Sequence, residues 1–119
     1  MRQKAKGFKH FKEAFFYSLN GVKACFKNEA GFRHECGACL LLVPLSFFVG
    51  ENGAEIAILL FSVFFVLIIE ILNSAVEAAI DRISLEHHKL SGLAKDLGSA
   101  AVFMAMLLCL LTWIVVFLF

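Results

Sequence analysis

The stretch Ile56–Asp81, IAILLFSVFFVLIIEILNSAVEAAID, runs from fourteen residues without a charge directly into three carboxylates and an asparagine. A soluble helix would place such polar groups on its hydrated face. In a membrane helix, each ionisable group held in hydrocarbon is costly unless it is paired, neutralised or ligated. The environment of this stretch is therefore decided by the rest of the chain.

The composition is that of a membrane protein. The chain has 119 residues, of which 61% are hydrophobic and 18% charged, and it contains fourteen phenylalanines. Soluble domains are about 45–50% apolar, so the excess predicts a small integral membrane protein with a single domain over residues 1–119. The net charge of +1 gives no reason to expect nucleic acid as a partner.

The basic residues fall into two blocks. Eight of the eleven lie between Arg2 and Arg33, and the other three are Arg82, Lys89 and Lys95. Segment 50–55, GENGAE, carries two glutamates and no base. Because basic residues are retained on the cytoplasmic side of short loops, we predict a cytoplasmic N-terminus, a cytoplasmic connection over 82–97, and three spans that leave the C-terminus outside.

The three predicted spans differ in clarity. Residues 98–119 carry no charge and are long enough to cross a bilayer, and the second span covers about 55–81. The first, about 32–49, is the weakest, because its strictly apolar part, CGACLLLVPLSFFV, has only fourteen residues. A two-span hairpin with an embedded loop at 36–49 is the alternative.

Residues 1–30 have a pattern of their own. Large apolar side chains recur at steps of three and four and are flanked by lysines, which predicts an amphipathic helix lying on the membrane surface. The apolar positions are Phe8, Phe11, Phe15, Leu19, Val22 and Phe26.

The polar groups of the opening stretch share one side of a helix at about 100° per residue. We call this set the carboxylate seam; it comprises Glu70, Asn73, Ser74, Glu77, Asp81 and Ser84. Glu70 and Glu77 are two turns apart, about 10 Å along the axis. Hydrogen bonding between helices accounts for two or three such residues, but three carboxylates without a base repel one another.

A cation relieves that repulsion, and oxygen ligands of this kind suit Mg²⁺. The residues alone therefore predict an intramembrane carboxylate site, metal-binding and open to the cytoplasm. A proton or ion pathway fits such a seam almost as well as an enzyme does.

Three blocks, NEAGFRHE (Asn28–Glu35), EILNSAVEAAIDR (Glu70–Arg82) and LSGLAKDLGSAAV (Leu90–Val102), closely resemble the small prokaryotic integral-membrane diacylglycerol kinase family. The resemblance covers nearly the whole chain. It implies an all-α membrane protein of the bacterial inner membrane, with an amphipathic surface helix and three transmembrane helices in a homotrimeric bundle. It also implies a kinase that converts diacylglycerol to phosphatidic acid with ATP and Mg²⁺, with undecaprenol as the alternative substrate.

The resemblance assigns a role to each polar position. Glu70 would be the general base, Glu29 and Glu77 would hold Mg²⁺, and Asn73 and Asp81 would support the site. The implied nucleotide contacts are His10, Tyr17, Glu29, Glu77, Glu86, His87, His88, Lys95 and Asp96. The implied lipid contacts are Phe32, Arg33, Glu35, Glu70, Ser99 and Trp113.

Simpler interpretations exist for several of these positions. The segment 86–88 could be a solvated loop, Lys95 and Asp96 an interfacial ion pair worth little, and Glu29 the end of a helix. His10 also departs from the family, which often has an arginine at this position. Glu70 and Glu77 are the residues for which a purely structural role is hardest to argue.

Overall fold

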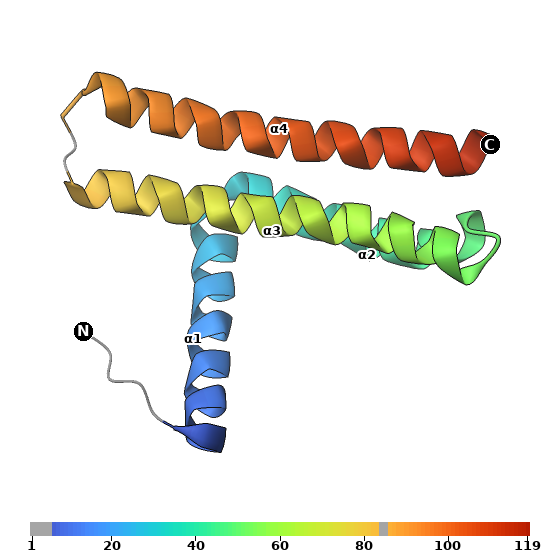
Figure 1. The fold of residues 1–119 in the computed structure, drawn as a ribbon, viewed down its shortest axis with the longest axis horizontal. Coiled ribbons are helices and arrows are strands. Elements are labelled where there is room, and N and C mark those ends of the chain that lie inside the picture. Colours follow the sequence, from blue (N-terminus) through green and yellow to red (C-terminus); the bar gives the residue numbers. More distant parts are fainter. Residues whose placement is uncertain (1–5, 84–85) are drawn as a thin grey trace.

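The described part of the chain is entirely helical. The computed structural model describes residues 6–83 and 86–119, and within them it contains four helices and no strand. These are α1 (Gly7–Asn28), α2 (Ala30–Val49), α3 (Gly53–Ile83) and α4 (Lys89–Leu118), shown in Figure 1. The predicted all-α class is confirmed. Ser84, a predicted member of the seam, lies outside the described residues.

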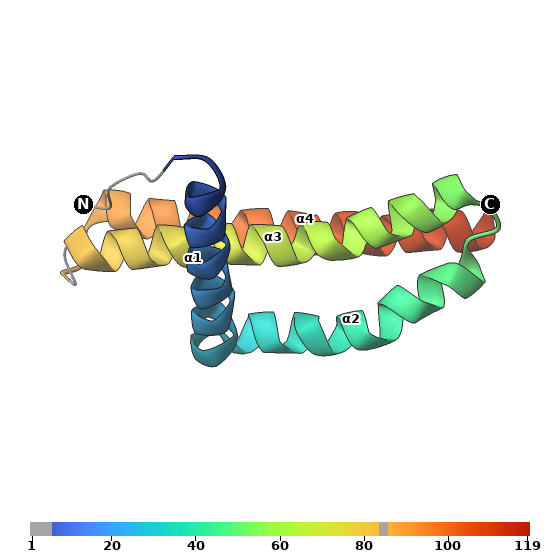
Figure 2. The same cartoon turned by 90° about the horizontal axis from the view of Figure 1, so that it is seen from below.

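Helices α2, α3 and α4 run alongside one another with alternating direction, and α1 lies across them (Figures 1 and 2). Each of the three is long and apolar enough to cross a membrane. The helix α2 begins at Ala30, six residues before the apolar run, and so reaches 20 residues. This continuous helix supports a third crossing rather than an embedded loop at 36–49.

Proline interrupts the hydrogen bonding of α2. Pro44 lies inside the helix, where its ring removes one backbone donor and clashes with the preceding turn. Figure 2 shows the resulting bend of α2. Beside it, the buried Ser46 hydroxyl donates to the Val43 carbonyl at 2.6 Å, so that its own polarity is satisfied within the helix.

Helix α3 is central, because it packs against both α2 and α4. Its N-terminal half is mostly apolar, and the neighbouring helices cover part of it. The buried apolar side chains of α3 and α4 are Leu59, Val63, Val66, Ile80 and Ala105. Ser62 is also buried, and its hydroxyl donates to the Leu59 carbonyl at 2.8 Å.

Most of the large apolar side chains face outward. Phe48 is 85% exposed and Phe103 70% exposed, although both belong to helices that can span a membrane. In water such a surface would be unstable, but against lipid tails or another chain it is the expected one. The apolar side chains of α1 are exposed as well: Phe8 is 81% and Phe11 69% exposed.

The connection before α4 is shorter than the predicted 82–97 segment. Helix α4 already begins at Lys89, so most of that segment is helical. His88 caps it: the side-chain Nδ1 accepts a hydrogen bond from the backbone N–H of Leu90 at 3.1 Å. Capping of this kind satisfies one of the free donors in the first turn of a helix. Sequence reasoning missed it because histidine is an unusual cap.

Candidate active site

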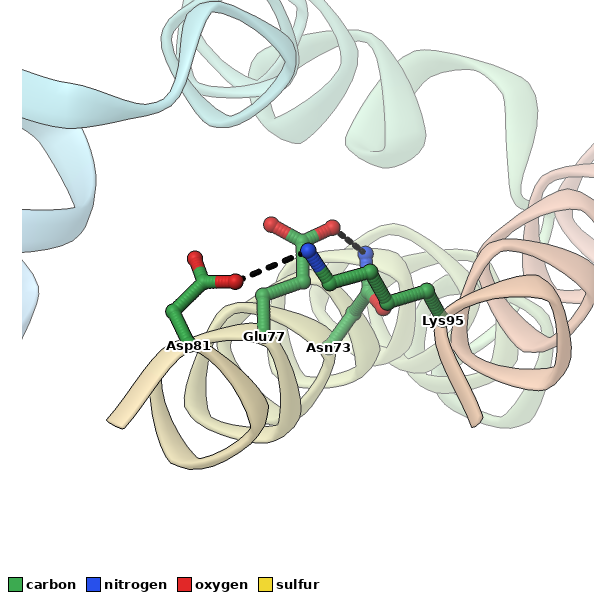
Figure 3. A network of polar contacts seen from close by, with 4 residues as sticks. All are labelled: Asn73, Glu77, Asp81 and Lys95. Carbon is green, nitrogen blue, oxygen red and sulfur yellow. Dashed lines mark hydrogen bonds and ion pairs between the residues drawn. The ribbon is translucent and has the colours of Figure 1, made fainter. Parts of the chain in front are cut away.

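The carboxylate seam lies along one side of α3. Figure 3 shows Asn73, Glu77 and Asp81 on that side, with Lys95 reaching toward them from α4. Glu70, Asn73 and Glu77 are half-buried, while Asp81 is exposed. The Asn73 amide Nδ2 donates to Glu77 Oε1 over a long 3.4 Å. The periodicity of the sequence predicted this arrangement correctly.

The Glu70 carboxylate has three other carboxylates as electrostatic neighbours. Its side chain interacts electrostatically with Glu35, Glu29 and Glu77. Glu29 is the residue between α1 and α2, and Glu35 belongs to the second turn of α2. The fold therefore places the predicted base and the two predicted metal ligands within electrostatic range of one another, near the corner where α1 meets α2.

The Glu70 carboxylate packs against the backbone of the α2 N-terminus. A Cβ placed on Gly31 would lie 3.2 Å from Glu70 Oε2 and 3.4 Å from Oε1. A side chain at position 31 would therefore require the carboxylate to shift by a few tenths of an ångström. Sequence reasoning did not assign Gly31 a role, because a glycine near the start of a helix gives no sign of what approaches it.

The basic side chain that reaches the seam, Lys95, is already paired with Asp81. Lys95 Nζ donates to Asp81 Oδ1 at 2.8 Å, with both side chains about half exposed, and an exposed pair of this kind adds little stability. Among the described residues, the cluster of Glu29, Glu70 and Glu77 thus has no basic group paired to it in the structure.

The donor set of this cluster fits Mg²⁺. Magnesium takes oxygen ligands, usually one or two carboxylates, and completes its shell with water and phosphate oxygens. Within the described residues, no group of three or more metal-ligating side chains closes a cage by itself. A carboxylate pair such as Glu29 and Glu77 suits a metal whose other ligands are water and phosphate oxygens.

The predicted nucleotide contacts of the α3–α4 connection surround one cavity. Its volume is about 180 Å³, and it opens beside the Lys95–Asp81 pair. The lining residues are Ile80, Asp81, Glu86, His87, His88, Ser91, Gly92 and Lys95. Five of them are residues that the sequence had singled out.

A second cavity is apolar and lies between α2, α3 and α4. It has a volume of about 270 Å³ and is lined by Glu35, Leu42, Val66, Met106, Cys109, Leu110 and Trp113. Glu35 and Trp113, both predicted lipid contacts, are thus on one cavity. The Trp113 Nε1 atom is buried and has no hydrogen-bond partner among the described residues.

Other predicted contacts are not assembled within one chain. His10 and Tyr17 belong to α1, which projects away from the other helices (Figure 1), and both are exposed. Asp96 and Ser99 are exposed on α4. Phe32 is 3% exposed and packs inside the fold, so within this chain it serves the core.

Arg33 has a structural task that the sequence did not indicate. Its Nη1 donates to the carbonyls of Phe26 and Lys27, each at 2.9 Å. These carbonyls belong to the last turn of α1, where helical partners are missing. One charged group thus ties the start of α2 to the end of α1 and supports the corner that carries Glu29.

Removing this cap should loosen the corner. We expect Arg33→Met to lower the hydrogen-exchange protection of the last turn of α1 by about tenfold, because hydrogen bonds to charged groups are the stronger ones. Arg82→Met, which removes the same charge at the end of α3, is the control. Equal protection in Arg33→Met and the unmodified chain would contradict the assignment.

Comparison with known proteins identifies the family. A sequence model described as prokaryotic diacylglycerol kinase matches residues 16–117. The chain is similar to the diacylglycerol kinase of Haemophilus influenzae, with 49% identity over 110 residues that cover 92% of this chain and 93% of the relative. The Escherichia coli K12 diacylglycerol kinase is 44% identical over 113 residues, covering 95% and 93% of the two chains. The chain therefore belongs to the prokaryotic diacylglycerol kinase family, a family of phosphotransferases.

Proposed function

We propose that this protein transfers the γ-phosphoryl group of ATP to the hydroxyl of diacylglycerol, which yields phosphatidic acid and ADP. Relatives that it matches over most of their length are diacylglycerol kinases. The observation that carries the proposal is that Glu29, Glu35 and Glu77 all lie within electrostatic range of Glu70. Phosphoryl transfer depends mainly on positioning and on neutralisation of charge, and such a cluster suits a metal–nucleotide complex.

Glu70 is the general base in this proposal. Its carboxylate accepts the proton as the lipid O–H bond breaks and a bond forms between the lipid oxygen and the γ-phosphorus. The bond from the γ-phosphorus to the bridging oxygen breaks, and ADP leaves with that oxygen. Contact with the Gly31 backbone supports the role, because a base is effective only when it is held within reach of the proton that it takes.

Glu29 and Glu77 would hold Mg²⁺ together with ATP. When bound, the metal neutralises negative charge on the phosphate oxygens. Asn73 donates to Glu77 and so orients its carboxylate. The cavity beside Lys95 is the candidate position for the nucleotide, and Glu86, His87 and His88 would contact it there.

The lipid would approach from the bilayer. The apolar cavity with Glu35 and Trp113 lies between helices that can span the membrane, and its buried indole N–H is free to donate to an acceptor oxygen. Arg33 and Ser99 would complete the contacts with the lipid headgroup. A hydroxyl-bearing glycerolipid combines the apolar body and polar end that such a cavity suits.

We propose a homotrimer with sites shared between subunits. Two observations support this. The apolar surface of α2–α4 is wide, and several predicted site residues are exposed and not gathered at the seam of their own chain. In a trimer, the projecting half of α1 in one subunit can bring His10 and Tyr17 to the seam of another. Asp96 of one subunit can reach the site of a neighbouring subunit in the same way.

The orientation follows from charge. Arg33, Arg82, Lys89 and Lys95 belong to the inner ends of α2, α3 and α4, and Figure 1 shows these ends on the same side of the bundle. Basic residues favour the cytoplasmic side. We therefore propose the inner membrane, with the N-terminus and the site at the cytosol and the C-terminus in the periplasm.

One assay tests the activity and the substrate together. The purified protein is placed in lipid bilayers with γ-labelled ATP and Mg²⁺, and diacylglycerol or undecaprenol is supplied separately. We expect label in phosphatidic acid, and Glu70→Gln prepared in parallel reports any contaminating kinase. Preference for undecaprenol would overturn the substrate alone. Absence of label in both lipids would overturn the kinase proposal and favour an ion- or proton-conducting seam.

A further inference from the structure

Gly98 is the place where α4 receives a polar side chain of α3. A Cβ built on Gly98 would overlap with Asn73 Oδ1 and would lie 3.2 Å from Asn73 Cγ. The helical glycines Gly21, Gly37 and Gly92 differ, because a Cβ on any of them would meet nothing within 4 Å. A side chain at position 98 would therefore force the Asn73 amide to move.

The amide of Asn73 is held by this contact in one direction. Its Oδ1 atom is buried and accepts no hydrogen bond from the described residues. Its Nδ2 atom points to Glu77 and donates to Oε1 (Figure 3). Because the amide is planar, the orientation that packs Oδ1 against Gly98 is also the one that directs Nδ2 at the carboxylate. An unpaired buried oxygen is costly, so this orientation needs a specific reason to persist.

We infer that Gly98 is a positioning residue of the seam: by leaving room for the Asn73 amide it orients Glu77 for metal-bound nucleotide, an inference that rests on the nucleotide-binding part of the proposed function. The residue acts through Asn73 and touches no reacting atom. The sequence places Gly98 at the start of the third predicted span and indicates nothing more, because nothing in LSGLAKDLGSAAV shows which glycine faces α3.

The consequence of a methyl group at position 98 follows from what it would meet. The overlapping atom is the end of a side chain, not backbone. Asn73 can therefore turn away, and the helices need not separate. The fold should persist while the hydrogen bond from Asn73 to Glu77 is lost. The effect should appear in the handling of MgATP rather than in assembly or in lipid affinity.

A double-mutant cycle isolates this effect. The proteins are the wild type, Gly98→Ala, Asn73→Ala and the double variant, all in the assembled, membrane-embedded form. Gly37→Ala is the matched control, because it makes the same change in a helix with open space around it. The dissociation constant for a non-hydrolysable ATP analogue with Mg²⁺ is measured calorimetrically, and KM values for MgATP and lipid are measured separately.

We expect Gly98→Ala to raise the nucleotide dissociation constant by about tenfold, the loss that outer partners of a metal site produce. The KM for lipid should stay within about twofold, and Gly37→Ala should bind nucleotide like the wild type. In the Asn73→Ala background, Gly98→Ala should have no further effect, because the atom that it displaces is gone.

Three results would overturn the inference: nucleotide binding by Gly98→Ala equal to that of Gly37→Ala, equal losses in nucleotide and lipid affinity, or additive losses in the double variant. A wild type that binds nucleotide but phosphorylates no lipid would refute the proposed function and leave this inference intact. A wild type that binds no nucleotide would refute both.

Discussion

Replacing Glu70 by glutamine is expected to lower kcat by about a thousandfold, within the range of about 10²–10⁴ that a general base contributes. Glutamine keeps the size and the contact with Gly31 but cannot accept the proton of the lipid hydroxyl. Nucleotide binding should change little, since the base acts on the other substrate. Initial rates with diacylglycerol in bilayers measure kcat, and calorimetric binding of a non-hydrolysable analogue measures the affinity.

Glu51→Gln is the matched control for this change. Glu51 is an exposed carboxylate in the connection between α2 and α3, at the opposite end of the spans from the seam, so its rate should equal that of the wild type. Near-normal turnover in Glu70→Gln would show that Glu70 is not the general base. A thousandfold loss accompanied by an equal loss of nucleotide binding would instead place Glu70 among the metal ligands.

Replacing Glu77 by glutamine should produce the complementary result. We expect the dissociation constant for Mg²⁺ with the ATP analogue to rise by more than about tenfold, since even outer partners of metal sites are worth about 10–100-fold in affinity. The apparent requirement for Mg²⁺ should rise in parallel, because one of two carboxylate ligands is neutralised. Titration of Mg²⁺ at fixed nucleotide concentration measures this shift.

The distinguishing measurement is the dependence on Mg²⁺ concentration. If Glu77 is a ligand, high Mg²⁺ should recover part of the lost activity of Glu77→Gln and none of that of Glu70→Gln. Recovery in both variants, or in neither, would contradict the division of tasks along the seam. Glu51→Gln again serves as the control with an unchanged Mg²⁺ requirement.

The helices and the seam could be predicted because both depend on local patterns in the sequence. Apolar runs of sufficient length report membrane spans, and Glu70, Asn73, Glu77 and Asp81 recur at steps of three and four on α3. The first span was the hardest to recognise because it contains Arg33 and Glu35, although the predicted range of about 32–49 lies within α2. These charged residues lower the hydropathy of a segment without interrupting its helix.

What the amino-acid sequence determined by itself is the set of helices, their likeness to a lipid kinase family, and the side of α3 that carries the carboxylates. All of these follow from neighbours along the chain. Only the tertiary structure decided that Gly31 lies against Glu70, that Gly98 receives Asn73, and that Arg33 caps α1. Such contacts join residues of different helices, and a glycine or a flexible arginine carries no local signal of the atom it will meet once the helices pack.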